Sequence, residues 1–468
     1  MDKFIQVAIF FSLTSIVALA TYYKCRQSKR SSNDTREYFL AGGGLSWVFV
    51  AGSLVMTNIS AEQIVGMNGS QNLLVAWWEI AAAIGILILA KWLIPIYYQY
   101  QCTTTTELLE RKYEDKGIRA MVSVLFMLGY AFILLPVVLY TGALFMKSMF
   151  HIQLPIIGIA ILFAIAGTLY SIFGGLRAIA ISDTFNGMGL LVMGFIVSYL
   201  AMNAINWDLS GLPYDHISLI GDSHSDIPWP TLFTGMIFIQ IFYWGTNMVI
   251  TQRALAANSV KEAQKGLYAA VVMKILMPII VVLPGLVALK LYGDIGDTAY
   301  GKLVGDVLPA WLSGAFAAVI AGAVLSSFNS CLNSAAALYT CDIHQNYINK
   351  NARVSKVGTI TSLIFTLVSL LLVPVFEQSG SIIALLQQLN GLYSMPVLAA
   401  FICALCFKNV KATAIKWGLI FGVLLYAIFT FLWSPLHYIH LMAITLFSTV
   451  YFTLLLNKRL GLSTIIED

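Results

Sequence analysis

The sequence contains little charge. Only 10% of its 468 residues are Asp, Glu, Lys or Arg, whereas soluble proteins carry about 25%. Cysteine is also scarce: there are 6, and the closest two, Cys403 and Cys406, lie inside an apolar run, so neither a disulfide framework nor a cysteine metal site is predicted. A chain that is 59% hydrophobic cannot cover a soluble surface, and a lipid bilayer is its expected environment.

Long apolar runs are what the sequence has in abundance. A bilayer core about 30 Å thick takes a helix of about 20 apolar residues, and only helices or closed barrels satisfy their backbone groups there. Runs of this length, rather than short alternating strands, predict an all-α polytopic membrane protein with about thirteen transmembrane helices. The predicted spans are 3–24, 45–69, 72–98, 118–147, 153–173, 178–205, 228–252, 266–291, 306–341, 354–376, 380–406, 413–433 and 436–456, the first read as a retained helix rather than a signal peptide.

Lys and Arg are distributed unevenly between the predicted loops. Short cytoplasmic loops of membrane proteins collect these residues. One alternating set of loops holds most of them, whereas the longest loop of the other set, 206–227, has none. We therefore expect a multi-pass protein of the cell membrane (plasma or bacterial inner membrane), with its N-terminus outside and its C-terminus in the cytoplasm. The net charge of +5 then reflects topology, and no nucleic-acid partner is predicted.

Two of the predicted spans are interrupted by polar residues. Span 45–69 contains "TNISAEQ", span 228–252 contains "YWGTN", and the two lie five spans apart. Interrupted helices at corresponding places in two halves are typical of inverted-repeat transporters, whose binding site lies near the bilayer midplane. We expect one membrane domain over 1–468, made of an extra helix and loop (1–44), a ten-helix 5+5 inverted-repeat core (45–406) and two accessory helices (407–468).

Ionisable and amide side chains lie where a bilayer should exclude them. Insertion of a charged residue at mid-bilayer depth costs about 2.5–3.5 kcal/mol, yet predicted spans contain Glu62, Glu79, Asp183 and Lys274. A purely structural Glu79–Lys274 pair is the simpler alternative, but apolar packing replaces such pairs easily, so we favour a polar cavity. Amides that both donate and accept, together with flat rings, suit a neutral sugar; the candidates are Asn58, Gln63, Gln240, Gln387, Trp78, Tyr243 and Trp244.

The stretch "GAVLSSFNSCLNS" at 322–334 is rich in small and hydroxyl residues. Tight helix packing explains most of such a run. Na⁺ prefers oxygen ligands, however, and Ser326 and Ser327 would supply hydroxyls while the interrupted helix at 56–59 would supply free carbonyls. A sodium site between the two segments is therefore predicted.

At these residues the sequence resembles the solute:sodium symporter family, and most closely its bacterial sodium/galactose branch, which has the core fold of LeuT-type transporters. The resemblance covers nearly the whole chain and rests on "REYFLAGG", "NISAEQIVGMNGS", "SIFGGLRAIAISD", "YWGTNMVITQRALAA", "KEAQKG", "VVLPG" and "SSFNSCLNS" followed by "YTCDIHQNYI". It implies a secondary active transporter, and no enzyme, that carries a neutral galactose- or glucose-like sugar into the cell by alternating access. Na⁺ would be the coupling ion.

The resemblance also implies residue roles. The sugar site would contain Asn58, Gln63, Met67, Trp78, Glu79, Gln240, Tyr243, Trp244, Lys274 and Gln387. Na⁺ would bind the carbonyls of Met56, Ile59 and Ala323 and the hydroxyls of Ser326 and Ser327, and Asp183 would mark the sodium exit path or a second cation site. The branch has serine, asparagine, tyrosine and phenylalanine where this chain has Ala82, Gln240, Trp78 and Ile383, which leaves the preferred sugar open.

Other functions stay open at this point. The nearest is a Na⁺-coupled symporter of another small solute, such as sialic acid, inositol, proline or a vitamin; a carboxylated one would favour a free basic residue, whereas Glu79 balances Lys274. A membrane enzyme would need a cluster of His, Asp or Cys, and only His437 and His440 lie close in sequence. A transporter-derived sensor or a channel also fits. The solute, the Na⁺ stoichiometry and the oligomeric state do not follow from the sequence.

Overall fold

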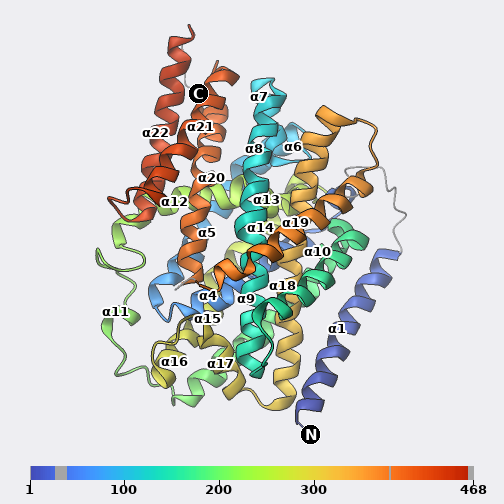
Figure 1. The fold of residues 1–468 in the computed structure, drawn as a ribbon, viewed down its shortest axis with the longest axis vertical. Coiled ribbons are helices and arrows are strands. Elements are labelled where there is room, and N and C mark those ends of the chain that lie inside the picture. Colours follow the sequence, from blue (N-terminus) through green and yellow to red (C-terminus); the bar gives the residue numbers. More distant parts are fainter. Residues whose placement is uncertain (1, 27–38, 379–380, 462–468) are drawn as a thin grey trace.

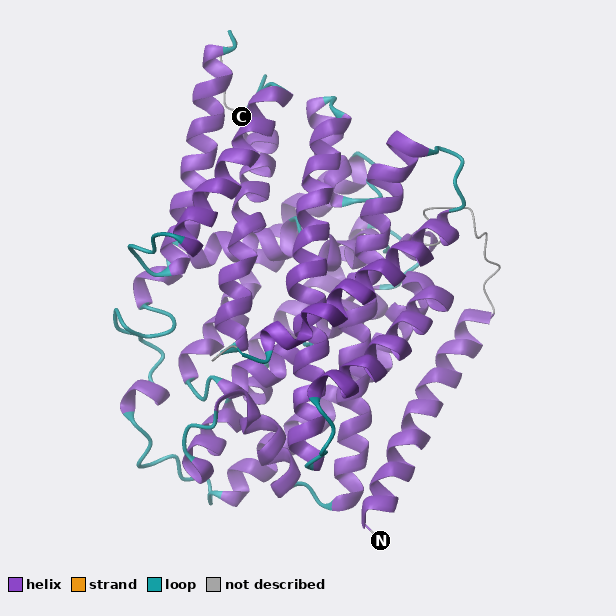
Figure 2. Ribbon diagram, viewed as in Figure 1, coloured by secondary structure: helices purple, strands orange, loops and turns teal. Residues whose placement is uncertain are grey.

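A computed structural model describes residues 2–26, 39–378 and 381–461. Within these ranges every element is helical and no strand occurs (Figure 2). The predicted all-α class is therefore confirmed. Part of the Lys/Arg-rich loop predicted after the first span, residues 27–38, lies outside the described residues.

The helical elements follow one another with mostly short connections. In the first part of the chain they are α1 (Asp2–Arg26), η1 (Ala41–Gly43), α3 (Trp47–Asn58), α4 (Ala61–Gly69), η2 (Leu73–Val75), α5 (Ala76–Ile88), η3 (Leu89–Leu93), α6 (Ile94–Gln99), α7 (Thr105–Tyr113), α8 (Lys116–Gly129), η4 (Tyr130–Leu134), α9 (Leu135–Phe150) and α10 (Ile156–Ala204). The rest are α11 (Tyr214–Ile217), η5 (Trp229–Leu232), α12 (Gly235–Gly245), α13 (Met248–Leu255), α14 (Val260–Leu276), α15 (Pro278–Val281), α16 (Leu283–Tyr292), η6 (Gly296–Thr298), α17 (Ala299–Val307), α18 (Ala310–Ala337), η7 (Leu338–Ile348), α19 (Val354–Phe376), α20 (Ile382–Cys406), α21 (Ala412–Phe431) and α22 (Tyr438–Arg459).

The apolar helices correspond in order to the predicted spans. Among the described residues, 8 helices are long and apolar enough to cross a membrane, and 3 bent pairs of helices pass the same test together. Two shorter apolar segments, Ala8–Val17 and Ile156–Ser171, match the first and fifth predicted spans. Large apolar side chains such as Leu367 and Leu371 on α19 are exposed, as expected of a surface that contacts lipid.

Both predicted interruptions are present as bends. The axes of α3 and α4 differ by 48° across Ile59 and Ser60, and the second pair, Trp229–Gly245 and Met248–Leu255, is bent by 49°. Asn247 stabilises the new start of α13, because its side chain accepts a hydrogen bond from the Val249 backbone N–H at 3.2 Å. The polar residues inside these two apolar runs therefore mark real breaks in the helices.

A third bend was not predicted. The segments Val260–Leu276 and Pro278–Tyr292 meet at 42° within the predicted span 266–291. Pro278 explains the bend, since proline lacks the backbone N–H that would continue the helix. This bend follows directly after Lys274, one of the predicted site residues, which lies in the last turn of α14.

Two boundaries predicted from the sequence are wrong. The predicted loop between 173 and 178 is helical, because α10 runs without interruption through 49 residues; glycine is frequent in membrane helices, and Gly174 and Gly175 do not break this one. Its two apolar segments, Ile156–Ser171 and Ile179–Ala204, still correspond to the two predicted spans. The segment between the predicted spans 306–341 and 354–376 is helical up to Ile348, and Asp342 in it is buried against α7 and α8.

The two kinds of predicted loop lie at opposite ends of the molecule. Figure 1 shows the C-terminal end and α7 at one end, and the N-terminal end, α11, α16 and α17 towards the other. The Lys/Arg-rich segment 100–117 contains α7, whereas the segment 206–227, without Lys or Arg, contains α11. Which end faces the cytoplasm stays a prediction.

Candidate functional site

A small cavity beside the first break gathers most of the predicted sugar-site residues. It is lined by Asn58, Gln63, Trp78, Glu79, Ala82, Ile239, Gln240, Tyr243, Trp244, Lys274 and Gln387. These residues come from the two parts of the first broken helix and from α5, α12, α14 and α20. Met67 is the only predicted sugar-site residue outside this lining; it is fully buried in α4. The cavity volume is about 30 Å³, so the side chains largely fill it.

Close packing of α5 against α12 forms one wall of the cavity. A Cβ atom on Gly85 would lie 2.3 Å from the backbone oxygen of Gln240 and 2.8 Å from the ring of Trp244. No side chain fits at that distance, so glycine allows the two helices to approach. The approach brings Trp78 and Glu79 on α5 next to Gln240 and Trp244 on α12.

A charged hydrogen-bond network lines this cavity. The Lys274 ammonium donates to the carboxylate of Glu79 and to the side-chain oxygen of Asn58. The Asn58 amide donates in turn to the Tyr243 hydroxyl at 3.1 Å. Lys274 and Glu79 are each only 1% exposed, and a buried charge is tolerated when it is paired and hydrogen-bonded. The cavity is therefore polar yet carries no net charge from this pair.

The amides of the cavity differ in how far their bonds are satisfied. Gln240 donates to the Trp78 backbone oxygen and accepts from the Trp244 indole N–H, both at 3.1 Å. The side-chain oxygen of Gln63, in contrast, is buried without a hydrogen-bond partner. Buried polar atoms are nearly always paired in proteins, so Gln63 offers a free acceptor inside the cavity.

The predicted sodium ligands lie on α18 and at the end of α3. The hydroxyl oxygens of Ser326 and Ser327 are buried without a hydrogen-bond partner. One turn further along, Ser330 is 3.2 Å from the Thr57 hydroxyl, which ties α18 to the last turn of α3. The last carbonyls of a helix have no partner within it, and this applies to Met56, because α3 ends at Asn58.

Asp183 on α10 lies in the same interior. It is fully buried, and one of its carboxylate oxygens accepts a hydrogen bond from Ser53 at 2.8 Å. The other oxygen has no hydrogen-bond partner. Arg253 on α13 attracts this carboxylate. Hydroxyls, a carboxylate and free carbonyls form a set of oxygen donors, which suits Na⁺.

A second buried charge network was missed by the sequence analysis. Arg119 on α8 binds the carboxylate of Asp342 through two nitrogens, at 2.7 and 2.6 Å, and that of Glu110 at 2.7 Å. Asp342 also accepts from Thr104 at 2.9 Å and from Thr106 and Ser123. The sequence features that could have indicated this network are the run of threonines at 103–106 and the acidic residue Asp342 directly after a predicted span.

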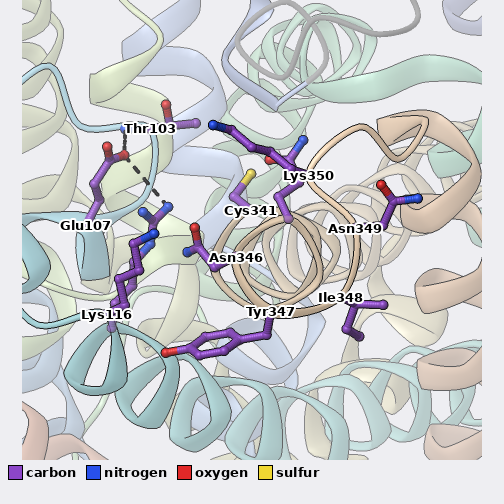
Figure 3. Close-up of a pocket in the computed structure, with 11 residues that line it drawn as sticks. Thr103, Glu107, Lys116, Cys341, Asn346, Tyr347, Ile348, Asn349 and Lys350 are labelled. Carbon is purple, nitrogen blue, oxygen red and sulfur yellow. Dashed lines mark hydrogen bonds and ion pairs between the residues drawn. The ribbon is translucent and has the colours of Figure 1, made fainter.

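A larger cavity of about 600 Å³ lies next to this network, between α7, α8 and η7. Figure 3 shows Glu107 and Lys116 on one side of it, with Asn346, Ile348 and other residues arranged around the end of the η7 helix. None of the predicted site residues lines it. His437 and His440 are the two histidines that lie close in sequence. His437 caps the start of α22 by accepting from the Ile439 backbone N–H, and His440 bonds to the Thr234 hydroxyl.

Comparison with known proteins identifies the family. The model of the sodium:solute symporter family matches residues 38–422. The chain belongs to the sodium:solute symporter family. It is 34% identical to the uncharacterized symporter YidK of Escherichia coli (strain K12), over 94% of this chain and 81% of that protein. It is 30% identical to the sodium/glucose cotransporter of Vibrio parahaemolyticus, over 100% of this chain and 92% of that one.

The fold has a solved counterpart. The substrate-bound, outward-open structure of a Na⁺-coupled sialic acid symporter matches with a TM-score of 0.84, at 18% identity over 99% of each chain. The predicted LeuT-like fold and membership of this family are thus confirmed. The protein is a Na⁺-coupled solute symporter rather than an enzyme, and Na⁺ is its coupling ion.

Proposed function

We propose that this symporter carries a neutral sugar, or a polyol of similar size, into the cell together with Na⁺. The observation that supports this most strongly is the convergence of amides, rings and one neutral ion pair on a single cavity. Sugar hydroxyls need partners that both donate and accept, which amide side chains provide. The apolar face of a sugar ring would lie against Tyr243 or Trp78.

The charge of the cavity favours a neutral solute over a carboxylated one. Lys274 is the only basic residue in the lining, and its ammonium is held by the carboxylate of Glu79. A carboxylated solute would have to displace Glu79 and leave it unpaired in a buried place, which is costly. A neutral solute can keep the pair and bind to the remaining donor of Lys274 and the free oxygen of Gln63.

The cavity must widen when a solute binds. Its volume of about 30 Å³ is well below the roughly 300–1,000 Å³ of sites that hold small-molecule ligands. In our proposal the bonds of Lys274 to Asn58 and Glu79 hold the cavity closed. A sugar hydroxyl would then take over the contact of Lys274 to Asn58 and leave the pair with Glu79 in place, so that binding and opening are coupled.

The first helix break connects the solute site to the ion site through Asn58, Met56 and Ile59. Asn58 lines the solute cavity, while Met56 and Ile59 at the same break carry the carbonyls proposed to bind Na⁺. An ion between this break and Ser326 and Ser327 would fix the end of α3, and therefore the position of the Asn58 amide. Na⁺ would raise solute affinity in this way, and the solute must raise Na⁺ affinity by the same factor.

Uptake into proteoliposomes tests the proposal. Purified protein is reconstituted, and labelled glucose, galactose, myo-inositol, sialic acid and proline are offered with an inward Na⁺ gradient or with K⁺ in its place. We expect Na⁺-dependent uptake of a sugar or polyol and none of the carboxylated solutes. Uptake of sialic acid or proline alone would contradict the neutral-solute assignment and favour the alternative symporter functions.

The sidedness of the chain belongs to the same proposal. With the N-terminus outside and the C-terminus in the cytoplasm, the core 45–406 would import the solute, while 1–44 and 407–468 would be accessory. Single cysteines placed at the exposed residues Trp207 and Lys458, labelled from outside in intact cells, test this. Labelling at 207 and protection at 458 are expected; the reverse pattern would contradict it.

A further inference from the structure

One buried carboxylate in the membrane interior has no basic partner. Among the described residues the buried acids are Glu62, Glu79, Glu107, Asp183 and Asp342. Glu79 pairs with Lys274, Asp342 and Glu107 with Arg119, and Asp183 is attracted by Arg253. Glu62 is 6% exposed and no Lys or Arg acts on it. An ionised carboxylate cannot stay buried alone without a large cost.

The Glu62 side chain faces a second, separate cavity. This cavity has a volume of about 10 Å³, room for a single atom or ion, and its lining residues include Glu62, Thr57, Tyr243, Asn247 and Ser327. One carboxylate oxygen of Glu62 and the hydroxyl oxygen of Ser327 are both buried without a hydrogen-bond partner. Two oxygens without partners thus border the same small space.

The other polar atoms of this cavity are already engaged elsewhere. The side-chain oxygen of Asn247 accepts from the Tyr130 hydroxyl at 2.7 Å, and the Thr57 hydroxyl bonds to Ser330. The titratable groups on which the Glu62 carboxylate acts are the Tyr243 phenol and the Cys331 thiol, and neither carries a positive charge. Ser60 and the Glu62 backbone N–H, at the start of α4, act on the carboxylate and favour its charge, but among the described residues no Lys or Arg pairs with it.

We propose that Glu62 and Ser327 bind an additional Na⁺ in this cavity, one that is carried with the solute. The inference rests on the proposed symport, and it places the ion away from Asp183, whose carboxylate bonds to Ser53 on α3. A carboxylate attracts a cation more strongly in a low-dielectric interior than in water. Thr57 and Asn247 also line the cavity, but their oxygens keep the hydrogen bonds described above, so the carboxylate of Glu62 and the hydroxyl of Ser327 are the proposed ligands.

The position of this cavity connects the two sites already described. It shares Tyr243 with the solute cavity and Ser327 with the proposed sodium site between α3 and α18. An ion bound to Glu62 would therefore hold Tyr243 on the solute side and Ser327 on the sodium side. Each solute molecule would carry one more positive charge than a transporter that uses the Ser326/Ser327 site alone.

Counting bound ions tests the inference without any solute. Purified wild type and Glu62→Gln are saturated with ²²Na⁺, and the bound ion is measured per protein molecule. We expect Glu62→Gln to bind one Na⁺ fewer than wild type. Glu114→Gln removes an exposed carboxylate at the end of α7 and should bind as many as wild type. Equal counts in wild type and Glu62→Gln would overturn the site.

A flux measurement separates this inference from the proposed function. In proteoliposomes with a transported solute, the membrane potential that stops net uptake gives the charge moved per solute. Glu62→Gln should move one charge fewer and still transport, with Glu62→Asp closer to wild type. If no sugar is transported, the proposed function fails while the ion count still decides on Glu62. H⁺ uptake is followed with a pH-sensitive dye inside the proteoliposomes. If wild type takes up H⁺ with the solute and Glu62→Gln does not, the assignment of this site to Na⁺ is overturned.

Discussion

The solute cavity and the neighbouring cation region are built from opposite kinds of polar group. In the solute cavity donors and acceptors largely satisfy one another: Lys274 binds Glu79 and Asn58, and Gln240 binds Trp244. In the cation region oxygens predominate, and several of them have no partner; these are the hydroxyls of Ser326 and Ser327 and one carboxylate oxygen each of Asp183 and Glu62.

This difference indicates how the two regions respond to their ligands. A cavity that satisfies its own groups is stable when empty of solute, and a solute must compete with internal bonds of similar strength. A region of unpaired oxygens gains much more from a bound cation, because buried acceptors without partners cost free energy. Na⁺ is therefore expected to determine the conformation of the helix break, and the solute is expected to bind to the conformation that Na⁺ stabilises.

The largest effect is expected when the buried ion pair of Lys274 and Glu79 is broken. Lys274→Ala leaves Glu79 as an unpaired buried charge, which costs about 3–5 kcal/mol of stability. We expect a lower apparent melting temperature in detergent and no solute uptake. The double variant Glu79→Leu/Lys274→Met should recover the melting temperature but not the uptake. Normal uptake by Lys274→Ala would contradict the assignment of Lys274 to the sugar site.

A methyl group at Gly85 should disturb the wall of the same cavity. Gly85→Ala places a Cβ 2.3 Å from the Gln240 backbone oxygen, and overpacking of this kind costs about 1–3 kcal/mol. Both the melting temperature and the uptake rate should fall. Gly158→Ala is the matched control, since its nearest heavy atom is 3.9 Å away. If both variants behave like wild type, the close approach of α5 and α12 does not support the site.

Two serines one turn apart on α18 sharpen the comparison. Ser327 has no hydrogen-bond partner, whereas Ser330 bonds to Thr57. Ser327→Ala should raise the Na⁺ concentration for half-maximal uptake by about tenfold, equivalent to about 1.4 kcal/mol, with an unchanged melting temperature. Ser330→Ala should show the opposite, a small loss of stability with nearly normal Na⁺ dependence. Identical Na⁺ dependence in wild type and Ser327→Ala would exclude this ligand.

The smallest effect is expected at Gln240. Gln240→Met removes the acceptor for the Trp244 indole and the donor to the Trp78 backbone oxygen. Each hydrogen bond contributes about 0.5–1.5 kcal/mol net, and because both bonds only position neighbouring rings we expect a rise of roughly tenfold or less in the solute concentration for half-maximal uptake. Na⁺ dependence at saturating solute should stay close to wild type. A complete loss of uptake would show that Gln240 does more than position Trp244.

The sequence predicted the features that depend on local chemistry. Polar residues in an apolar run predicted the breaks at Ile59–Ser60 and Thr246–Asn247, because lipid offers such groups no partner and interrupted helices are where transporters use them. The amides, rings and charges of the cavity were predicted from the resemblance and from their cost in a bilayer, although Met67 does not line it. Their roles in binding stay predictions.

Features that depend on tertiary contacts were missed. Asp342 was placed in a loop, since its burial depends on Arg119, far away in sequence. The loop predicted between 173 and 178 is part of the continuous α10, and its glycines are residues that membrane helices tolerate. Glu62 was noticed as an intramembrane acid, but only the packing of α4 and its neighbours shows that no basic residue faces it.

The central claim is that one Na⁺-dependent break positions the residues that bind a neutral solute, and reciprocal binding tests it most directly. The dissociation constant of the transported sugar is measured with Na⁺ and with K⁺ in its place, and that of Na⁺ with and without the sugar. We predict that each ligand tightens the other by the same factor, as linkage requires. Sugar affinity that is equal in Na⁺ and K⁺ would contradict the account.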